Sequence, residues 1–351
     1  MNLSRAIYLN SMENSDEDLE IRHRKPRVYE TRPNFLKDMD DDEFITKFRV
    51  SKATCSMLLQ KIGWKMEHLT SRNYALSPED KLLLALRFYA CGNFLVAVGD
   101  FCNVSTSSAC RAVKEVSFHI AAMSREYIKF GDPDDVVEGL QKLSNFPNVM
   151  GAIGCTHIRI KSPGQRQDEA FRNRKGHFTL KVQAVSSAQL IIQDLVARWP
   201  GSTPNSTIFE NSRLKQRWES GEFQNSVLLG NGYKSSKYMM TPVAKPTTEA
   251  EKHYNQSQIA TVNIVSKCFE AWKQRFPVLS YGMHIHVDTA KVVIVACAVL
   301  HNIAIQEKDP LPPKIEDSSP ESFEDDEEID DIVDASDGFH RNDFINKYFD
   351  R

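Results

Sequence analysis

Apolar residues recur at intervals of three and four over residues 40–123, which is the spacing of amphipathic helices. One helix is predicted to begin at Pro78, because Ser77 suits an N-cap, proline suits the first helical position, and two acidic residues follow in the first turn. Two shorter helices are predicted over residues 93–102 and from a cap at Ser105 to about residue 120. This part of the chain is therefore expected to be helical.

The two shorter helices are joined by a tight turn at Asn103 and Val104, so that they resemble a helix-turn-helix. In that interpretation the second of them enters the major groove of DNA, and its polar side contacts phosphates and base edges. The same pattern equally suits an ordinary helical bundle with a polar outer face. The candidate DNA-contacting residues on this polar side are Thr106, Ser107, Arg111 and Lys114.

The hydrophobic period changes after residue 145, where short runs rich in β-branched residues replace the helical spacing. Three of these runs, "NVMGAIGCTHIRIK", "FTLKVQAVSS" and "LIIQDLVARW", predict strands, and "SVLLGNGY" predicts a short fourth strand. Helices are predicted over residues 204–221, 247–276 and 288–306, and the last of them is apolar enough to be buried. Strands followed by helices indicate a mixed sheet flanked by helices, so the predicted fold class is α+β or α/β.

The composition is that of a soluble globular protein, because 41% of the 351 residues are hydrophobic, which suffices for the cores of two modest domains. Seven cysteines are scattered along the chain without a Cys-x-x-Cys pair that would indicate a zinc site. They favour a reducing, intracellular compartment. No signal peptide and no membrane span is expected.

The net charge of −3 conceals a strong asymmetry along the chain. Residues 316–337 contain 12 acidic residues and no Lys or Arg, so the rest of the chain carries about +9. A basic body suits a polyanionic partner, while an acidic tail screens that body, binds another protein's basic surface, or only keeps the chain soluble. A short basic block at residues 21–27 suits nuclear import, DNA contact or a solvated arm.

The changes of period and charge divide the chain into four parts. A flexible, basic and polar arm is predicted at residues 1–39, and a helical domain with the helix-turn-helix at 40–145. A second domain with the mixed sheet follows at 146–307, and an acidic, largely disordered tail ends the chain at 308–351.

Seven spaced blocks carry a resemblance to a known family. They are "LSPEDKLLLALRFYACGNF", "VMGAIGCTHIRIKSP", "FRNRKGHFTLKVQAV", "ARWPGSTPNSTIF", "LLGNGYKSSKYMMTP", "TTEAEKHYNQSQIAT" and "ACAVLHNIA". In this order, between residues 76 and 304, they resemble the blocks of the PIF/Harbinger transposase-derived nucleases. The resemblance implies an N-terminal helix-turn-helix followed by an RNase H-like domain of the DDE superfamily, in which three acids bind two divalent metal ions, Mg²⁺ or Mn²⁺, for DNA strand cleavage and transfer. It also implies a nuclear protein that acts beside a Myb/SANT-type DNA-binding partner.

The chain departs from this family where metal ligands are needed. Two-metal cleavage places the metal ions about 3.5 to 4 Å apart, and hard divalent cations prefer anionic oxygen ligands. Every position that the resemblance assigns to such an acid is neutral in this chain. The three catalytic positions are Gly154, Asn205 and Ser266, and two further family aspartates correspond to Ser187 and Asn231.

Few other residues could replace these acids. Glu270 is the best candidate, because it shares a helix face with the third neutral position one turn earlier, whereas Asp194 falls within a strand. His157 is expected to be a hydrogen-bonded core residue. The pair in "HIHVD", His284 and His286, is expected on one strand face and lacks the further ligands that zinc needs.

The sequence therefore favours a domesticated transposase-derived protein that is catalytically degenerate and acts as a DNA- or chromatin-associated scaffold in the nucleus, with a cytoplasmic pool left open. In that case no catalytic residue and no cofactor is expected. Two alternatives stay open at this point. One is an active, divalent-metal-dependent DNA nuclease of the Harbinger type, in which Mg²⁺ or Mn²⁺ is bound. The other is a protein-interaction module that does not bind DNA.

Overall fold

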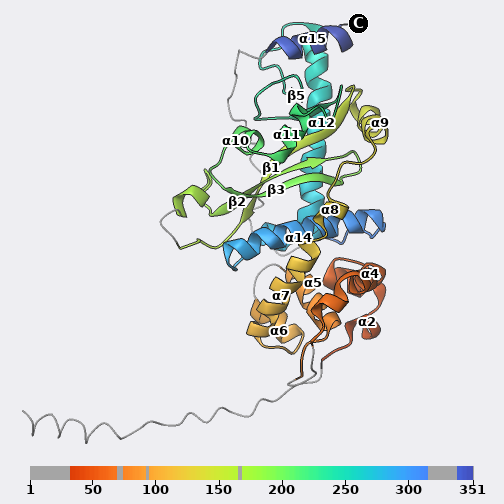
Figure 1. The fold of residues 1–351 in the computed structure, drawn as a ribbon, viewed down its shortest axis with the longest axis vertical. Helices are drawn as coiled ribbons and strands as arrows, with labels where there is room; N and C mark the ends of the chain where they lie inside the picture. Colours follow the sequence, from red (N-terminus) through yellow and green to blue (C-terminus); the bar gives the residue numbers. More distant parts are fainter. Residues whose placement is uncertain (1–31, 69–73, 92–94, 165–167, 315–337, 351) are drawn as a thin grey trace, which may run out of the picture. The chain divides into compact units, whose positions relative to one another are not determined.

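A computed structural model describes residues 32–68, 74–91, 95–164, 168–314 and 338–350 of the chain. The basic block at residues 21–27 and the acidic run at 316–337 lie outside these residues. Arg32–Arg351 forms one compact unit by its internal contacts. Figure 1 shows the helices α2 to α7 of this unit, and its β-sheet with the helices that accompany the strands.

The N-terminal helices begin where the sequence supplies caps. Asp40, Ser51, Ser105 and Asp132 each accept a hydrogen bond from a backbone N–H in the first turn of the helix that follows. The elements in chain order are α2 (Phe35–Asp38), α3 (Asp41–Phe48), α4 (Lys52–Ile62), the 3₁₀ helix η1 (Gly63–Met66), α5 (Pro78–Cys91), α6 (Leu95–Phe101), α7 (Thr106–Ala121), α8 (Ser124–Tyr127) and α9 (Pro133–Ser144). The predicted starts at Pro78 and after Ser105 are confirmed.

The turn between α6 and α7 is as tight as predicted. The backbone N–H of Val104 donates to the carbonyl of Gly99 over 2.9 Å, and Asn103 adopts a φ of 52°. A Cβ at Gly99 would lie 2.6 Å from the carbonyl oxygen of Val104, so only glycine allows this approach. α6 and α7 are therefore connected as closely as the two helices of a helix-turn-helix.

The sheet has five strands in the order β3-β2-β1-β4-β5. Its strands are β1 (Val149–Arg159), β2 (Thr179–Ser186), β3 (Ile192–Pro200), β4 (Val227–Gly230) and β5 (Met239–Met240), and the 3₁₀ helix η2 (Asp168–Phe171) lies between β1 and β2. β1, β2 and β3 pair antiparallel, whereas β4 runs parallel to β1 and β5 parallel to β4. The predicted mixed sheet is confirmed, and β5 is an addition that the sequence pattern did not predict.

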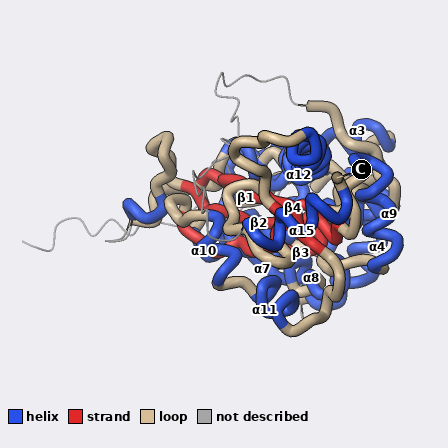
Figure 2. The backbone as a smooth tube through the Cα atoms, turned by 90° about the horizontal axis from the view of Figure 1, so that it is seen from above, coloured by secondary structure: helices blue, strands red, loops and turns tan. Residues whose placement is uncertain are grey.

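Helices cover both faces of this sheet. In Figure 2, α12 (Glu249–Arg275) lies over one face, and α10 (Asn205–Glu210) and α11 (Arg213–Glu219) lie over the other. The single helix predicted over residues 204–221 is thus two helices. The break follows from Ser212, whose hydroxyl donates to the Phe209 carbonyl and accepts from the Lys215 N–H, so that it ends one helix and caps the next.

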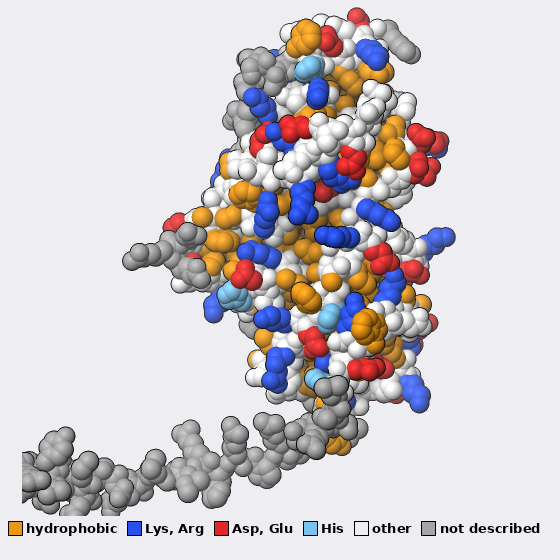
Figure 3. Space-filling view, viewed as in Figure 1, with side chains coloured by type: hydrophobic (Ala, Val, Ile, Leu, Met, Phe, Trp, Pro, Cys, Tyr) orange, Lys and Arg blue, Asp and Glu red, His pale blue; other side chains and the backbone are white. Residues whose placement is uncertain are grey.

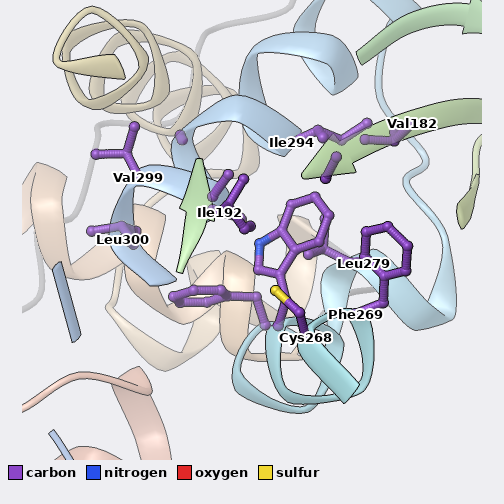
Figure 4. Close-up of a cluster of buried hydrophobic side chains, with 14 of the residues drawn as sticks. Val182, Ile192, Cys268, Phe269, Leu279, Ile294, Val299 and Leu300 are labelled. Atoms are coloured by element: carbon purple, nitrogen blue, oxygen red, sulfur yellow. The ribbon is translucent and has the colours of Figure 1, made fainter. Parts of the chain in front are cut away.

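The face under α12 holds the apolar core of the sheet. α13 (Val278–Tyr281) and α14 (Val287–Gln306) complete its cover. Figure 4 shows Phe269 of α12, Val182 of β2 and Ile294 of α14 in one cluster of buried side chains. Burial of such side chains contributes most of the free energy that holds α12 on the sheet.

α14 is the core helix that the sequence predicts. It has the length and apolar composition of a membrane span, but 67% of its most apolar window is buried inside the protein, against α7, α8 and β3. Its contacts with α7 and β3 mean that the helical part and the sheet share one hydrophobic core. The boundary predicted at residue 145 is therefore a change of secondary structure within one compact unit.

The N-terminal limit of the fold differs from the predicted one. The guanidinium of Arg32 forms an ion pair with Asp80 over 2.9 Å, and α2 buries Phe35 against the ring of Phe101. Residues 32–39 consequently belong to the folded unit and not to the predicted arm at 1–39.

The prediction of a largely disordered tail is wrong for residues 338–348, which form helix α15 (Gly338–Tyr348). Ile345 and Phe349 are buried, and the ring of Phe349 contacts those of Phe146 and Tyr254 at 5.3 and 5.4 Å. The acidic run before this helix dominates the composition of the tail, whereas the apolar residues that dock the helix stand after it.

Candidate degenerate metal site

Strand β1 presents its alternate residues to the two faces of the sheet. A Cβ built at Gly154 would meet side chains of α12, so Gly154 faces that helix. The neighbouring Cys155 points to the other face, where its sulfur lies 3.4 Å from the hydroxyl of Tyr233. The first position that the family resemblance assigns to a metal-binding aspartate is therefore on the α12 face.

The space beside Gly154 is filled by apolar side chains. A Cβ at this position would lie 2.8 Å from Cγ1 of Val265 and 3.6 Å from Cε2 of Phe269, both on α12. A side chain longer than hydrogen thus requires Val265 to move. A carboxylate there would also lose part of its hydration beside two apolar groups.

Asn231 lies next to Gly154 on the neighbouring strand. Gly230 at the end of β4 pairs with Ile153, and Asn231 follows directly. Its Oδ1 accepts a hydrogen bond from Nε2 of Gln258 on α12 over 3.2 Å, so it also faces this helix. Its amide joins the end of β4 to α12 without contributing a negative charge.

α12 supplies the third position. Ser266 is half-buried and follows Val265, the residue that covers Gly154. Glu270, the predicted replacement for a lost acid, lies one turn further along α12 and is exposed. On α12, Glu270 is the acidic residue that the sequence predicts as a replacement metal ligand.

Asn205 does not lie beside Gly154, contrary to its predicted grouping with Gly154 and Ser266. It begins α10, which packs on β2 from the face opposite α12. Phe209, one turn further along α10, contacts Tyr233 at 5.9 Å, and the Tyr233 hydroxyl in turn lies near Cys155. The neutral residue that does lie beside Gly154 is Asn231, which the sequence treated as a secondary position. Knowledge of the strand pairing would have identified Asn231. It follows β4, which runs parallel to β1, so it falls next to the residue of β1 that follows Ile153.

Ser187 has a structural role in the turn between β2 and β3. It is buried, and its hydroxyl accepts from the backbone N–H groups of Gln189 and Ile191, each over 3.3 Å. These bonds satisfy the donors of a short turn. The position therefore closes a connection and does not face the space beside Gly154.

These positions do not fit a two-metal centre. Gly154, Asn231 and Ser266 provide no anionic oxygen, and hard divalent cations depend on such ligands. Among the described residues, no group of three His, Cys, Asp or Glu side chains lies close enough together to hold a metal ion. No catalytic step through a metal ion follows from this arrangement.

One half-buried carboxylate of the sheet, Asp194, nevertheless has a buried oxygen, its Oδ2. Asp194 on β3 pairs with Val185, which pairs with Ile153, so it lies on the face opposite Gly154. Burial raises the pKa of Asp194 to about 6, and the charge of Arg217 opposes this rise. A single carboxylate on the wrong face does not restore the missing ligands.

The histidines considered for chemistry have structural partners. Nδ1 of His157 lies 2.9 Å from the hydroxyl of Thr179, so the expected hydrogen bond is present, but the residue is half-buried and not in the core. His284 and His286 are both exposed, but they lie in an irregular segment and not on the predicted strand. Nδ1 of His286 accepts from the backbone N–H of Asp288 over 3.3 Å and so caps α14.

The four candidate DNA-contacting residues are all exposed on α7: Thr106, Ser107, Arg111 and Lys114. Ser107, Arg111 and Lys114 follow one another at intervals of four and three, so they form one stripe. The opposite side of α7 buries its apolar residues against α5 and α14. The helix is thus amphipathic, with a basic outer surface.

The sequence is similar to known proteins over most of its length. Residues 153–302 match the DDE superfamily endonuclease family. The Homo sapiens protein named "Putative nuclease HARBI1" is 30% identical over 279 residues, which cover 77% of this chain and 80% of that protein. The Xenopus laevis protein of the same name is 26% identical with the same coverage, and the Arabidopsis thaliana "Protein ALP1-like" is 22% identical over 77% of this chain and 72% of that protein.

No solved structure matches the chain. The strand order β3-β2-β1-β4-β5, with helices on both faces, agrees with the RNase H-like fold that the family implies. The predicted fold class is therefore confirmed. Given the identity of 30% to a relative that the chain covers by four-fifths, the chain belongs to the DDE superfamily endonuclease family and is homologous to the transposase-derived HARBI1 proteins.

Proposed function

We propose that the protein is a catalytically degenerate member of this family that acts as a DNA- or chromatin-associated scaffold in the nucleus. The observation that carries the proposal is the packing of Val265 against Gly154, at 2.8 Å from where a Cβ would stand. The position has lost its acid, and the space that a metal ligand needs has been filled by an apolar side chain. Such a filled site favours retention of the fold for binding over retention of cleavage.

DNA association is proposed to use the basic stripe of α7, namely Ser107, Arg111 and Lys114. Contacts of this kind go mainly to phosphates, so they position the protein and depend strongly on salt. Figure 3 shows further Lys and Arg side chains across the middle of the face that it draws. The excess of cations outside the acidic run agrees with a polyanionic partner.

Titration of duplex DNA over a range of salt concentrations tests this binding. Each lost phosphate contact lowers the slope of log K against log salt by about 0.9, so Arg111→Ala with Lys114→Ala should lower it by about 2 for any DNA sequence. Lys245→Ala with Lys267→Ala removes the same charge from exposed positions elsewhere and should leave the slope unchanged. Binding that ignores salt, or an equal loss in both variants, would contradict the proposal.

Catalytic status has a separate test. Supercoiled plasmid incubated with the protein and Mg²⁺ or Mn²⁺ is expected to stay intact, because the three positions offer no anionic ligand set. Glu270→Gln is the informative variant, since Glu270 is the acid nearest in sequence to Ser266. Metal-dependent nicking that disappears in this variant would establish an active nuclease and overturn the proposal.

A protein-interaction role is the second candidate, and exposed aromatic side chains favour it. Phe118 continues the stripe of α7 and is 62% exposed, and Trp64 on η1 is 67% exposed. Aromatic side chains are enriched at protein–protein interfaces relative to the rest of the surface. The partner would be a Myb/SANT-type DNA-binding protein, as the family resemblance implies. The test is a pull-down of the protein from nuclear extract that has been treated with nuclease. If the partner is still recovered, the contact is between proteins. If the partner is lost, the association depends on DNA.

A further inference from the structure

Two large aromatic side chains are exposed beside the basic stripe of α7. Trp64 on η1 is 67% exposed, and Phe118 near the end of α7 is 62% exposed. The two elements are in contact, and Lys81 joins them. Its Nζ donates to the Met66 carbonyl at the end of η1 over 2.8 Å and pairs with Glu115 of α7 over 3.0 Å. The two aromatic side chains therefore stand on neighbouring elements.

A lysine and a histidine connect the two rings. Nζ of Lys65 lies 5.3 Å from the centre of the Trp64 ring, and the ring of His119 lies 5.6 Å from that of Phe118. Burial lowers the pKa of His119, Glu115 opposes this fall, and the charge of Lys65 adds to it, so the ammonium acts on the imidazole from nearby. The side chains of η1 and of the end of α7 thus form one surface.

The charges beside these rings favour an anionic ligand. Arg111 and Lys114 on α7 and Lys65 on η1 are exposed. Glu115 is already paired across the contact between α7 and η1, and Glu67 is an exposed acid that follows η1. Three cations against one unpaired acid leave a net positive charge. We refer to the following residues together as the η1–α7 surface: Trp64, Lys65, Arg111, Lys114, Phe118 and His119.

We propose that the η1–α7 surface binds unpaired nucleotides of DNA. Exposed aromatic rings stack on bases, and cations beside them bind phosphates, which is the combination that proteins use to hold single strands. In a duplex the bases are stacked on one another, so rings beside the phosphate contacts would find no free base face. The inference rests on the proposed association with DNA and names the form of DNA that this surface holds.

The test titrates the full chain with an oligothymidine of about 20 nucleotides and with a duplex of the same length, each carrying a dye for fluorescence polarisation. Trp64→Ala with Phe118→Ala should weaken binding of the single strand at least tenfold and change binding of the duplex less than about twofold, because only the stacking contacts are lost. Trp64→Phe with Phe118→Tyr keeps both rings and should retain the wild-type affinity. Phe339→Ala removes a ring that is 72% exposed on α15 and should change neither titration. Urea unfolding shows whether the four forms are equally folded.

Tryptophan emission reports on the same contact directly. Trp64 is exposed, whereas Trp218 and Trp272 are buried, so a ligand on the η1–α7 surface acts mainly on Trp64. A thymine that stacks on the indole should quench its emission, and Trp64→Phe should remove this quenching. Quenching that is equally large in Trp64→Phe would contradict the proposal.

The outcomes separate this inference from the proposed function. If Arg111→Ala with Lys114→Ala weakens duplex binding while the ring variant binds the single strand as the wild type does, only the η1–α7 surface is overturned. Equal losses for single strand and duplex in the ring variant overturn base stacking. A wild-type protein that binds neither form of DNA overturns both proposals. A ring variant that keeps both forms of DNA but loses the Myb/SANT-type partner assigns the rings to a protein contact.

Discussion

The packing of Val265 against Gly154 makes an acidic side chain at this position costly. Gly154→Asp places a Cβ 2.8 Å from Val265 and a carboxylate among apolar groups, so we expect a loss of about 2–4 kcal/mol in the free energy of unfolding and no metal-dependent nicking. Urea unfolding measures the loss. Gly154→Ala isolates the steric part, and Val265→Ala in the Gly154→Asp background should recover some stability. A Gly154→Asp protein that is as stable as the wild type and gains stability with Mg²⁺ would disprove this account.

Titration of Asp194 is expected to make the free energy of unfolding depend on pH. The pKa of Asp194 is raised to about 6 in the folded protein by burial, so its charged form is disfavoured there. The resulting destabilisation is absent below the ordinary aspartate pKa of about 4 and complete above 6. Asp194→Asn should therefore gain up to about 3 kcal/mol over the wild type between pH 4 and pH 7, as measured by urea unfolding. The exposed Asp135→Asn serves as the control, and a gain that does not change with pH would contradict the prediction.

The sequence predicted part of the candidate site but not its geometry. The family resemblance identifies Gly154 and Ser266 directly, because both positions are read along the chain. Whether Asn205 or Asn231 lies beside Gly154 depends on which strand pairs with β1. Whether Val265 fills the space beside Gly154 depends on how α12 packs on the sheet. Residue spacing along the chain predicts neither of these two contacts, so only the structure reveals them.

At the scale of single elements, Asn302 of α14 ties two other elements to the core. Its Nδ2 donates to the carbonyls of Tyr127 and Ile192, at 2.8 and 2.7 Å, and its Oδ1 accepts from the Ile192 N–H at 2.9 Å. Asn302→Ala leaves these buried backbone groups without partners and should cost about 3–5 kcal/mol. Thermal unfolding measures the loss of stability, and hydrogen exchange of the Ile192 amide measures the loss of its hydrogen bond. The exposed Asn263→Ala should change neither, and an unprotected Ile192 amide in the wild type would refute the role.

Element prediction succeeded where the signal is local. The caps at Ser77 and Ser105 and the long apolar run of α14 are visible in the sequence, and these three helices begin within two residues of their predicted starts. β5 is only two residues long and exists because it pairs with β4. The break between α10 and α11 depends on one serine. The first feature follows from a tertiary contact and the second from the hydrogen bonds of one side chain, and neither alters the apolar period along the chain.

At the scale of the whole molecule, α15 joins the end of the chain to a segment two hundred residues earlier. The hydroxyl of Tyr348 accepts from the side chain of Asn148, just before β1, over 3.1 Å. The composition of the last 44 residues does not predict this helix, because acidic residues dominate it and few apolar residues dock the helix. These apolar residues are Phe344, Ile345, Tyr348 and Phe349. The domain limits read from charge and period therefore missed a part of the fold that contributes to its core.

This docking predicts a large loss of stability when one aromatic ring near the C-terminus is removed. Phe349 is 7% exposed and contacts Phe146 and Tyr254, so Phe349→Ala should lower the free energy of unfolding by about 3 kcal/mol. Phe339→Ala removes the same ring from the first turn of α15, where it is 72% exposed, and should change stability by less than about 0.5 kcal/mol. Urea unfolding of the full chain measures both. Equal effects would show that α15 contributes nothing through its packing. A large loss in Phe349→Ala alone establishes that the segment after the acidic run is a structural part of the protein.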